Sequence, residues 1–228
     1  MKTAIFFLLT SFPIFHCFCQ SKITFIKFCP LALIDDNSFP TIQGGIEFNL
    51  SDKISWYNEL GIKYRKSFYE NINVDTNFIA SKGFKVKSEI RYYFQANKIK
   101  NKEQHYFAIN GFFYQDHHNT QISYYLNSDS SSYKKDAFGV QKNVFGLNFI
   151  YGYQEQLAKK IFVDFYAGVG IRLRNISTKQ KEYDDTRDSY VSPSVDINLR
   201  AERDQVDAKA GNSFLKHVTF GLRLCYKL

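Results

Sequence analysis

The sequence predicts an all-β chain: a single eight-stranded antiparallel transmembrane β-barrel of the outer-membrane type, with long extracellular loops. Three observations predict this fold. Apolar and polar residues alternate along many segments, strand-forming aromatic residues are abundant, and the chain opens with a segment typical of export. Of the 228 residues, 44% are hydrophobic and 18% are aromatic, with 23 Phe and 16 Tyr, as expected for strands. The mean hydropathy of −0.34 suits a barrel whose strands turn every second residue toward a polar interior.

The first 20 residues read as a signal peptide, which leaves residues 21–228 as one outer-membrane β-barrel domain. Lys2 supplies the positive start, and residues 4–15 supply an apolar middle that is too short to cross a bilayer as a helix. No later segment is long and apolar enough for a transmembrane helix. The sequence therefore predicts export followed by insertion through strands.

Cleavage after Cys19 or Gln20 would leave two cysteines, too few for a disulfide scaffold. A lipoprotein would instead carry its lipid on Cys17 or Cys19, but a bulky residue precedes each of them. Cys29 and Cys225 fall at inward positions of the first and last predicted strands, which are neighbours in a closed barrel. They could form a disulfide in an oxidising periplasm, and we expect two buried free thiols.

Eight segments show the period-two alternation of strands. The last is the clearest, because Val218, Phe220 and further apolar residues alternate with Thr219, Gly221 and polar residues up to the terminal leucine. The terminal strands of outer-membrane barrels end similarly, usually on Phe. The eight predicted strands cover residues 22–34, 40–50, 54–68, 82–94, 104–116, 143–154, 161–175 and 216–228.

The predicted connectors differ in length between the two ends of the barrel, as in outer-membrane barrels. Three short connectors share one end as periplasmic turns, and the longer connectors share the other, together with one short connector at residues 35–38. The short turns are residues 51–53, 96–103 and 155–160, and the longer connectors are residues 69–82, 117–136 and 176–216.

Charged residues gather on the inward faces of the predicted strands. A soluble β-sandwich could place the same charges on its solvent face, but the signal peptide and the last strand favour a closed barrel, which satisfies all backbone groups in lipid. The charges could line a solute pathway that prefers anions, and we expect them instead to fill a narrow lumen as ion pairs together with Tyr rings. The predicted lumen charge network consists of Glu47, Glu59, Lys63, Arg65, Lys85, Lys87, Glu89, Arg91, Asp164, Arg172, Arg174 and Arg223.

Several of these segments also carry a resemblance. Residues 27–33 read Lys-Phe-Cys-Pro-Leu-Ala-Leu, and similar strand motifs follow at residues 45–48, 59–64, 89–94 and 164–172. The chain resembles small, uncharacterised outer-membrane β-barrel proteins of the Bacteroidota, over most of its length after residue 20 and least over residues 176–216. The resemblance implies the eight-stranded barrel and no particular reaction.

A hydrolase site near the outer end of one strand is the candidate for catalysis. Some eight-stranded barrels are lipid A-modifying enzymes that use a His, a Ser and a carboxylate; here His117 and His118 follow Asp116, with Ser123 and Ser67 as candidate nucleophiles. A triad is defined by its geometry, which the sequence does not supply. The alternative is that these residues are the polar end of a strand where it meets a loop. Adjacent histidines on a strand point to opposite faces, so they do not predict a metal pair.

Two further features have simple structural readings. The acidic stretch at residues 181–188 could bind a divalent cation, although it lacks the regular ligand spacing of an EF-hand, and we expect a solvated loop. Gly168 and Gly170 lie inside a strand with no helix after them, which excludes a nucleotide-binding loop. We expect them to make room for Tyr or Arg side chains that cross the lumen.

The sequence thus predicts an outer-membrane protein with a structural or surface-interaction role, without a reaction, cofactor or metal that the sequence identifies. The alternatives are a narrow pore for small solutes and a lipid A-modifying enzyme. The expected partners are outer-membrane lipid, the barrel-assembly machinery through the C-terminal strand, and an extracellular ligand at the loops. Although the formal net charge is +8, the basic residues are not clustered, which argues against nucleic acid.

Overall fold

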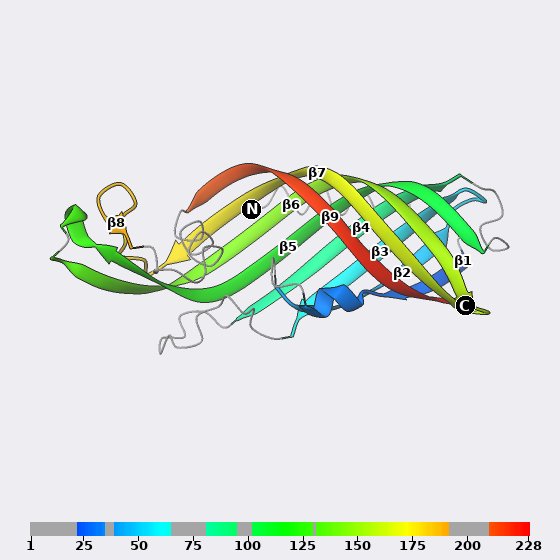
Figure 1. The fold of residues 1–228 in the computed structure, drawn as a ribbon, viewed down its shortest axis with the longest axis horizontal. Helices are drawn as coiled ribbons and strands as arrows, with labels where there is room; N and C mark the ends of the chain where they lie inside the picture. The colour runs from blue at the N-terminus through cyan, green and yellow to red at the C-terminus, as the bar shows by residue number, and fades with distance from the viewer. Residues whose placement is uncertain (1–21, 35–38, 65–80, 95–101, 130, 192–209) are drawn as a thin grey trace, which may run out of the picture.

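A computed structural model describes residues 22–34, 39–64, 81–94, 102–129, 131–191 and 210–228 (Figure 1). These residues form nine strands and two short 3₁₀ helices, η2 (Pro30–Ile34) and η3 (Leu126–Ser128). The strands are β1 (Lys22–Phe28), β2 (Thr41–Asn49), β3 (Ile54–Lys63), β4 (Lys82–Tyr93), β5 (Glu103–Tyr125), β6 (Tyr133–Ala158), β7 (Ile161–Lys179), β8 (Ser189–Tyr190) and β9 (Gly211–Lys227).

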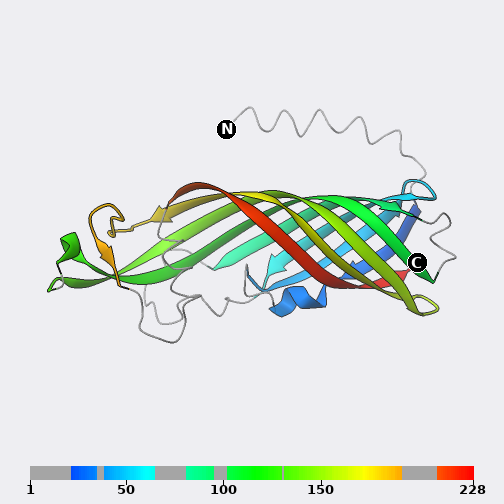
Figure 2. The same ribbon diagram turned by 45° about the horizontal axis from the view of Figure 1, so that its top comes forward.

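Eight of the strands form a ring-like antiparallel sheet. From β1 to β7 each strand pairs with the next one in the chain, β7 pairs with β9, and β9 pairs with β1. The pairing of β4 with β5 continues the ring across the gap that follows residue 94. Figure 2 shows the strands running obliquely round the ring, with the C-terminus of β9 beside β1. The prediction of an all-β chain with eight antiparallel strands is confirmed.

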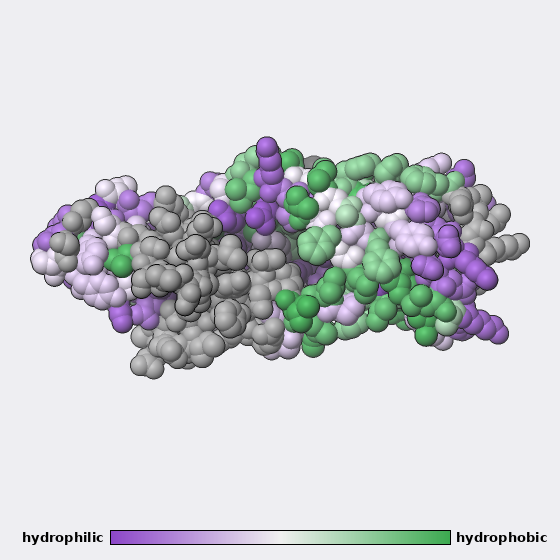
Figure 3. All heavy atoms as spheres, viewed as in Figure 1, coloured by the Kyte–Doolittle hydropathy of each residue, from purple (hydrophilic) through white to green (hydrophobic). Residues whose placement is uncertain are grey.

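Side chains alternate between the interior of the ring and its outer surface. On β4, for example, Lys85, Glu89 and Arg91 are buried, whereas Val86 and Ile90 between them are exposed. The polar residues therefore lie inside and the apolar residues outside, the reverse of a soluble domain. Figure 3 shows the apolar residues over the outer face of the ring. Within the described part of the chain, no helix is long and apolar enough to cross a membrane.

The first strand is shorter than its predicted range of residues 22–34. β1 ends at Phe28, and Pro30 begins helix η2, where the backbone N–H of Ala32 donates to the carbonyl of Cys29. Proline has no N–H for a strand ladder and fixes φ near the helical value, so it ends the strand. The prediction that this segment is one continuous strand is therefore wrong.

Residues 117–136 are not a loop, because β5 and β6 continue as a long hairpin beyond the ring. The pairing runs without interruption from Glu103↔Glu155 to Tyr125↔Tyr133, and β8 adds a short strand beside Tyr124. Residues 118–142 and 176–191 together form what we call the hairpin lobe, at the left of Figure 1. Its own apolar core explains why the strands continue, and consists of Ile122, Tyr124, Phe138, Val140, Ile176 and Tyr183.

The predicted connector at residues 176–216 is also partly strand. β7 continues to Lys179, β8 lies in the lobe, and β9 begins at Gly211, while residues 192–209 fall outside the described residues. The signal peptide at residues 1–20 and the connector at residues 35–38 likewise fall outside them.

The ring has a short seam between β1 and β9. Their pairing consists of four residue pairs, from Phe25↔Lys227 to Phe28↔Leu224. From Arg223 back to Gly211, on the N-terminal side of Leu224, β9 pairs in the described structure with β7 alone. In the described structure, one flank of β9 therefore has no paired strand over residues 211–223, and helix η2 contacts part of it.

Candidate functional site

Four acidic and four basic side chains meet inside the ring, at the level where β1 pairs with β9. Nine ion pairs of 2.6–3.6 Å join them. The charges of this group balance, because each acid is matched by one base. We call it the charge cluster, and its members are Glu47, Glu59, Glu89, Asp164, Lys27, Lys87, Arg91 and Arg223.

Asp164 of β7 is the central acid of the charge cluster. Its Oδ2 lies 2.8 Å from Nζ of Lys27 and 2.9 Å from Nη1 of Arg91. Nη1 of Arg223 lies 3.6 Å from the same oxygen, and the hydroxyl of Tyr106 donates to Oδ1 at 2.7 Å. This single carboxylate thus joins β1, β4, β5 and β9, which lie on different sides of the ring.

Tyrosine rings fill the space between the charged groups. The ring of Tyr57 lies 4.7 Å from the guanidinium carbon of Arg91 and 4.6 Å from that of Arg223, between the two cations. Tyr166 covers Arg223 at 3.9 Å, and Tyr106 covers Arg91 at 4.5 Å. Aromatic faces attract cations, so these rings both pack the lumen and stabilise the arginines.

The charge cluster is buried except for Lys87, whose side chain is 24% exposed. Glu47, Arg91 and Asp164 are each 0% exposed, and the hydroxyls of Ser55 and Tyr93 donate to Glu47 at 2.6 and 2.8 Å. Buried charges are tolerated where they are paired and hydrogen bonded. The cluster therefore packs this level of the ring with buried, paired charges.

A second inward group lies nearer the hairpin lobe. Nζ of Lys63 contacts Oδ1 of Asp116 at 2.8 Å, and Nδ1 of His118 lies 3.1 Å from Oδ2 of the same carboxylate. The two candidate nucleophiles do not complete a triad there among the described residues. Ser123 lies on the outer face, where its Oγ accepts a hydrogen bond from Tyr133 at 2.9 Å, and Ser67 lies outside the described residues.

Other predicted lumen residues have separate surroundings. Nζ of Lys85 donates to the carbonyl of Phe39 at 3.0 Å. Nε of Arg174 donates to Oγ of Ser213 at 3.0 Å. Arg172 is half-buried, and its Nε is buried without a hydrogen-bond partner. Arg65 lies outside the described residues.

The predicted lumen charge network omits Lys27, and the prediction that Tyr rings help to fill the lumen does not single out Tyr57, Tyr106 or Tyr166. Lys27 indicates that the odd-numbered residues of the first strand face inward, but both faces of this strand are largely apolar, so its place in an ion-pair network could not be predicted. The tyrosines at inward positions of β3, β5 and β7 alternate with apolar residues and read as ordinary aromatic strand residues. The available signal was their shared parity with Glu59, Asn110 and Asp164.

Both cysteines of the described chain are free and buried. The thiol of Cys29 donates to Oε2 of Glu59 at 3.1 Å, and that of Cys225 points to the carbonyl of Arg223 at 3.6 Å. β1 and β9 are neighbours as predicted, but Cys225 is opposite Lys27 in the register. The structure therefore shows two free thiols and not a disulfide across the seam.

The acidic stretch of the hairpin lobe is used for local structure. Oδ2 of Asp136 accepts the backbone N–H groups of Glu182 and Tyr183, at 2.7 and 2.8 Å. Asp188 accepts those of Asn127 and Asp184, at 3.1 and 3.0 Å. In the described part of the chain, no group of three or more His, Cys, Asp or Glu residues could hold a metal ion. The cation-binding interpretation of residues 181–188 therefore has no structural support.

The pKa of Asp188 shows how these hydrogen bonds act. Burial alone would raise the pKa of this carboxyl, but the N–H groups of Asp184 and Asn127 and the guanidinium of Arg187 outweigh burial and hold the pKa below its usual value. Hydrogen bonds that favour the charged form have this effect. Asp188 is therefore ionised when it ties η3 and β8 into the lobe.

The glycines of β7 make room for the neighbouring strand and not for side chains across the lumen. A Cβ at Gly168 would meet the carbonyl oxygen of Phe149, and one at Gly170 would meet that of Leu147, both on β6. The expectation that they accommodate Tyr or Arg is wrong for this pair. That role belongs to Gly152 instead, where a Cβ would meet the ring of Tyr106.

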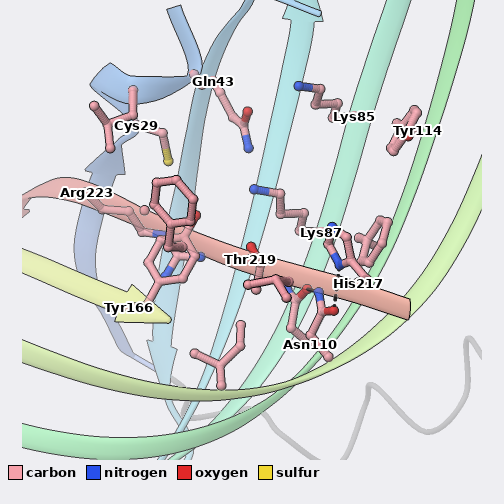
Figure 4. A pocket seen from close by; sticks show the side chains of 18 of the residues that line it. Cys29, Gln43, Lys85, Lys87, Asn110, Tyr114, Tyr166, His217, Thr219 and Arg223 are labelled. Carbon is pink, nitrogen blue, oxygen red and sulfur yellow. Dashed lines mark hydrogen bonds between the residues drawn. The ribbon is translucent and has the colours of Figure 1, made fainter. Parts of the chain in front are cut away.

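A cavity of about 590 Å³ lies between the charge cluster and the hairpin lobe, beside the unpaired flank of β9 (Figure 4). Lys85 and Lys87 of β4 and Asn110 of β5 line it from within the ring. His217 lines it from β9, with Nδ1 2.8 Å from Oδ1 of Asn148. Figure 4 shows these side chains around one space, with helix η2 and Cys29 at its edge.

The family model described as "Protein of unknown function (DUF3575)" matches residues 33–194, which is more than half of the chain. The chain belongs to the DUF3575 family. The matched residues include β2 to β8, and therefore Glu47, Glu59, Glu89, Arg91 and Asp164 of the charge cluster. Lys27 and Arg223 of the cluster lie outside the part matched by the DUF3575 model. No curated protein and no solved structure shows a significant match to the chain.

Proposed function

We propose that this protein is an outer-membrane β-barrel with a plugged lumen, whose role is structural or surface interaction through the hairpin lobe. The observation that carries the proposal is the reversed polarity of the ring, with a buried charge cluster inside and an apolar exterior. Soluble monomers rarely expose apolar patches of more than a few hundred Å², whereas a lipid-facing barrel requires them.

The outer surface of the ring has the composition and height of a membrane-facing band. Val218, Phe220 and Ile109 are 70%, 75% and 58% exposed. On β4 the outward positions from Phe84 to Phe94 are apolar or aromatic apart from one serine. A tilted membrane-spanning strand needs about 9–11 residues, which is the length of this run.

The edges of the band also fit a bilayer. On β5 and β6 the outward pairs are apolar up to Phe113↔Phe145 and become polar from Gln115↔Asn143 into the hairpin lobe. At the other edge, exposed tyrosines accumulate, among them Tyr92, Tyr151 and Tyr226. Aromatic girdles at the interface are typical of membrane barrels.

The plug argues against an open pore, and the dispersed histidines and serines argue against the lipid A-modifying enzyme. The hairpin lobe extends beyond the band on a rigid double strand, and binding residues often lie on such projections. We propose outer-membrane lipid and an extracellular ligand at the lobe as partners, together with the barrel-assembly machinery at β9. The resemblance to Bacteroidota barrels and the signal-peptide reading of residues 1–20 support export to the outer membrane.

The test is fractionation of the expressing cells, followed by electrophoresis of the outer-membrane fraction with and without boiling. We expect the protein in that fraction, with a faster band before boiling. Purified protein in a planar bilayer should show no steady conductance, because the charge cluster blocks the ring. A soluble periplasmic protein without a heat-dependent shift would contradict the barrel, and stable conductance would contradict the plug.

A further inference from the structure

The cavity beside β9 reaches from the interior of the ring to its outer surface. Consecutive residues from Lys216 to Arg223 line it, although alternate residues of a strand point to opposite faces. A cavity can contact both faces of a strand only where it passes the strand's edge. That edge is the flank of β9 that, over residues 211–223, has no paired strand in the described structure.

The inner part of the cavity is positively charged. The basic side chains that line the inner part are Lys85, Lys87, Arg172, His217 and Arg223, while Lys216 lies on the outward face of β9, and no Asp or Glu is among the described lining residues. The nearest acids of the charge cluster already bind Lys87 and Arg223. The lining therefore presents an excess of positive charge toward the cavity.

Two buried hydrogen-bond donors in this lining have no acceptor among the described residues. They are Nδ2 of Asn110, a residue that is 2% exposed, and the buried Nε of the half-buried Arg172. Buried donors are rarely left unpaired, because each one costs roughly 1–3 kcal/mol. Both atoms are N–H donors, so the missing partner is an acceptor such as a carboxylate or phosphate oxygen.

The outer part of the cavity is apolar. Leu31 and Ile34 of η2 face Val218 and Phe220 of β9 across it, and all four are exposed. If the ring is lipid-facing, as proposed above, this part opens into the hydrocarbon layer. A volume of about 590 Å³ lies within the range of small-molecule sites.

We propose that this cavity binds a single-chain amphiphile with an anionic head group. The head group, a phosphate or carboxylate, lies inside the ring and accepts hydrogen bonds from Asn110 and Arg172. The alkyl chain leaves past the edge of β9, between Phe220 and η2. The path of the alkyl chain rests on the membrane location proposed above. The binding of the head group does not depend on it.

The test is a binding titration of the full chain in non-ionic detergent, followed by native mass spectrometry. The probes are dodecyl phosphate, inorganic phosphate and dodecyltrimethylammonium. We expect one saturable site for dodecyl phosphate, at least tenfold weaker binding of inorganic phosphate, and no site for the cationic amphiphile. Equal affinity for the two phosphates would identify a free anion as the ligand and overturn the amphiphile.

Three variants locate the site. Arg172→Gln should weaken dodecyl phosphate binding about tenfold, and Lys216→Gln at the exposed mouth should weaken it severalfold. Ala32→Trp should narrow the exit, so that dodecyl phosphate binding falls while inorganic phosphate binding is kept. The matched control is Arg174→Gln, two residues along the same face of β7 and outside the cavity lining.

Equal affinity for dodecyl phosphate in all variants, or equal loss in Arg172→Gln and Arg174→Gln, would overturn the proposal. Each variant is first checked for the heat-dependent gel shift, so that misfolding is recognised. If the protein proves soluble, the titration is repeated without detergent. Loss of the membrane location then remains distinguishable from loss of the anion site.

Discussion

At the scale of single residues, the interior of the ring is held by charged side chains that are almost all buried. Asp164 contacts Lys27, Arg91 and Arg223 and accepts a hydrogen bond from Tyr106. Desolvating such ions is costly, and their mutual attraction offsets that cost only in this arrangement. The cluster therefore contributes less to net stability than to fixing which strand faces which across the ring.

The central position of Asp164 predicts that Asp164→Asn strongly lowers the free energy of unfolding. Removing the charge leaves three buried cations with too few acceptors, and the loss of one partner of a buried pair costs about 3–5 kcal/mol. Urea unfolding of the purified protein in lipid vesicles, followed by the gel shift, measures the change. The control is Asp52→Asn in the exposed turn after β2, which should stay within about 0.5 kcal/mol of the parent. Similar losses in both variants would contradict the central role of Asp164.

The inward charges could be predicted from sequence because strand parity is strict. Glu47, Glu89 and Arg91 occupy positions of one parity on their strands, and the structure buries all three. Their pairing could not be predicted, because it depends on register and on contacts across the ring. Lys27 illustrates this limit. Its partner Glu47 lies on the neighbouring β2, whereas its partner Asp164 lies on β7, 137 positions away in the sequence.

At the scale of elements, the hairpin lobe behaves as a small domain added to the ring. Its apolar core and its carboxylate-to-backbone hydrogen bonds are separate from the charge cluster. The sequence of residues 117–136 is rich in Ser, Asn and Tyr, which suggested a loop. The continued pairing of β5 with β6 could not be read from composition, because Ile122 and Phe138 are buried only when the segment from β7 to β8 folds over them.

The lobe should loosen in acid while the ring persists. The pKa of Asp188 is lowered in the folded protein, so its carboxylate stabilises the lobe above the ordinary pKa of about 4. That stabilisation is lost as the pH falls through the lower, folded-state pKa. Pepsin cleavage within residues 118–142, normalised to an unfolded substrate, should therefore accelerate as the pH falls below the ordinary pKa of about 4.

A variant of Asp188 separates the protonation of this carboxylate from the other effects of low pH on the lobe. Asp188→Asn should be cleaved faster than the parent above the ordinary pKa of about 4, and should gain less on acidification. The gel shift should remain unchanged in both proteins, because the ring does not depend on the lobe. A parent whose lobe is cleaved at the same normalised rate above and below about pH 4 would refute the role of Asp188.

At the scale of the whole molecule, the ring is unevenly joined. β5 and β6 pair over their full length, whereas β1 and β9 share four residue pairs. Strand pairing is what holds such a sheet together, so the short seam should be the first part of the ring to open. The sequence contained the signal for this weakness in Pro30, but the consequence for β9 required the register.

Hydrogen exchange tests the order of opening. In detergent, the amides of residues 25–28 and 224–227 should exchange earlier than the amides paired between β3 and β4, such as those around Tyr57 and Glu89. Local exposure cannot explain such a difference, because Phe25 and Cys225 are as buried as Tyr57. Uniform protection round the ring would show that the seam is no weaker than the other strand pairs.

The seam also sets the timing of folding in the cell. Because β1 pairs with β9, the first described strand must wait until almost the whole chain has been synthesised before its second neighbour exists. Contacts between residues so far apart in sequence form slowly, and meanwhile the apolar outer positions remain without cover. If the ring is lipid-facing, as proposed above, we expect the chain to need a partner that shields its apolar strands until β9 pairs with β1.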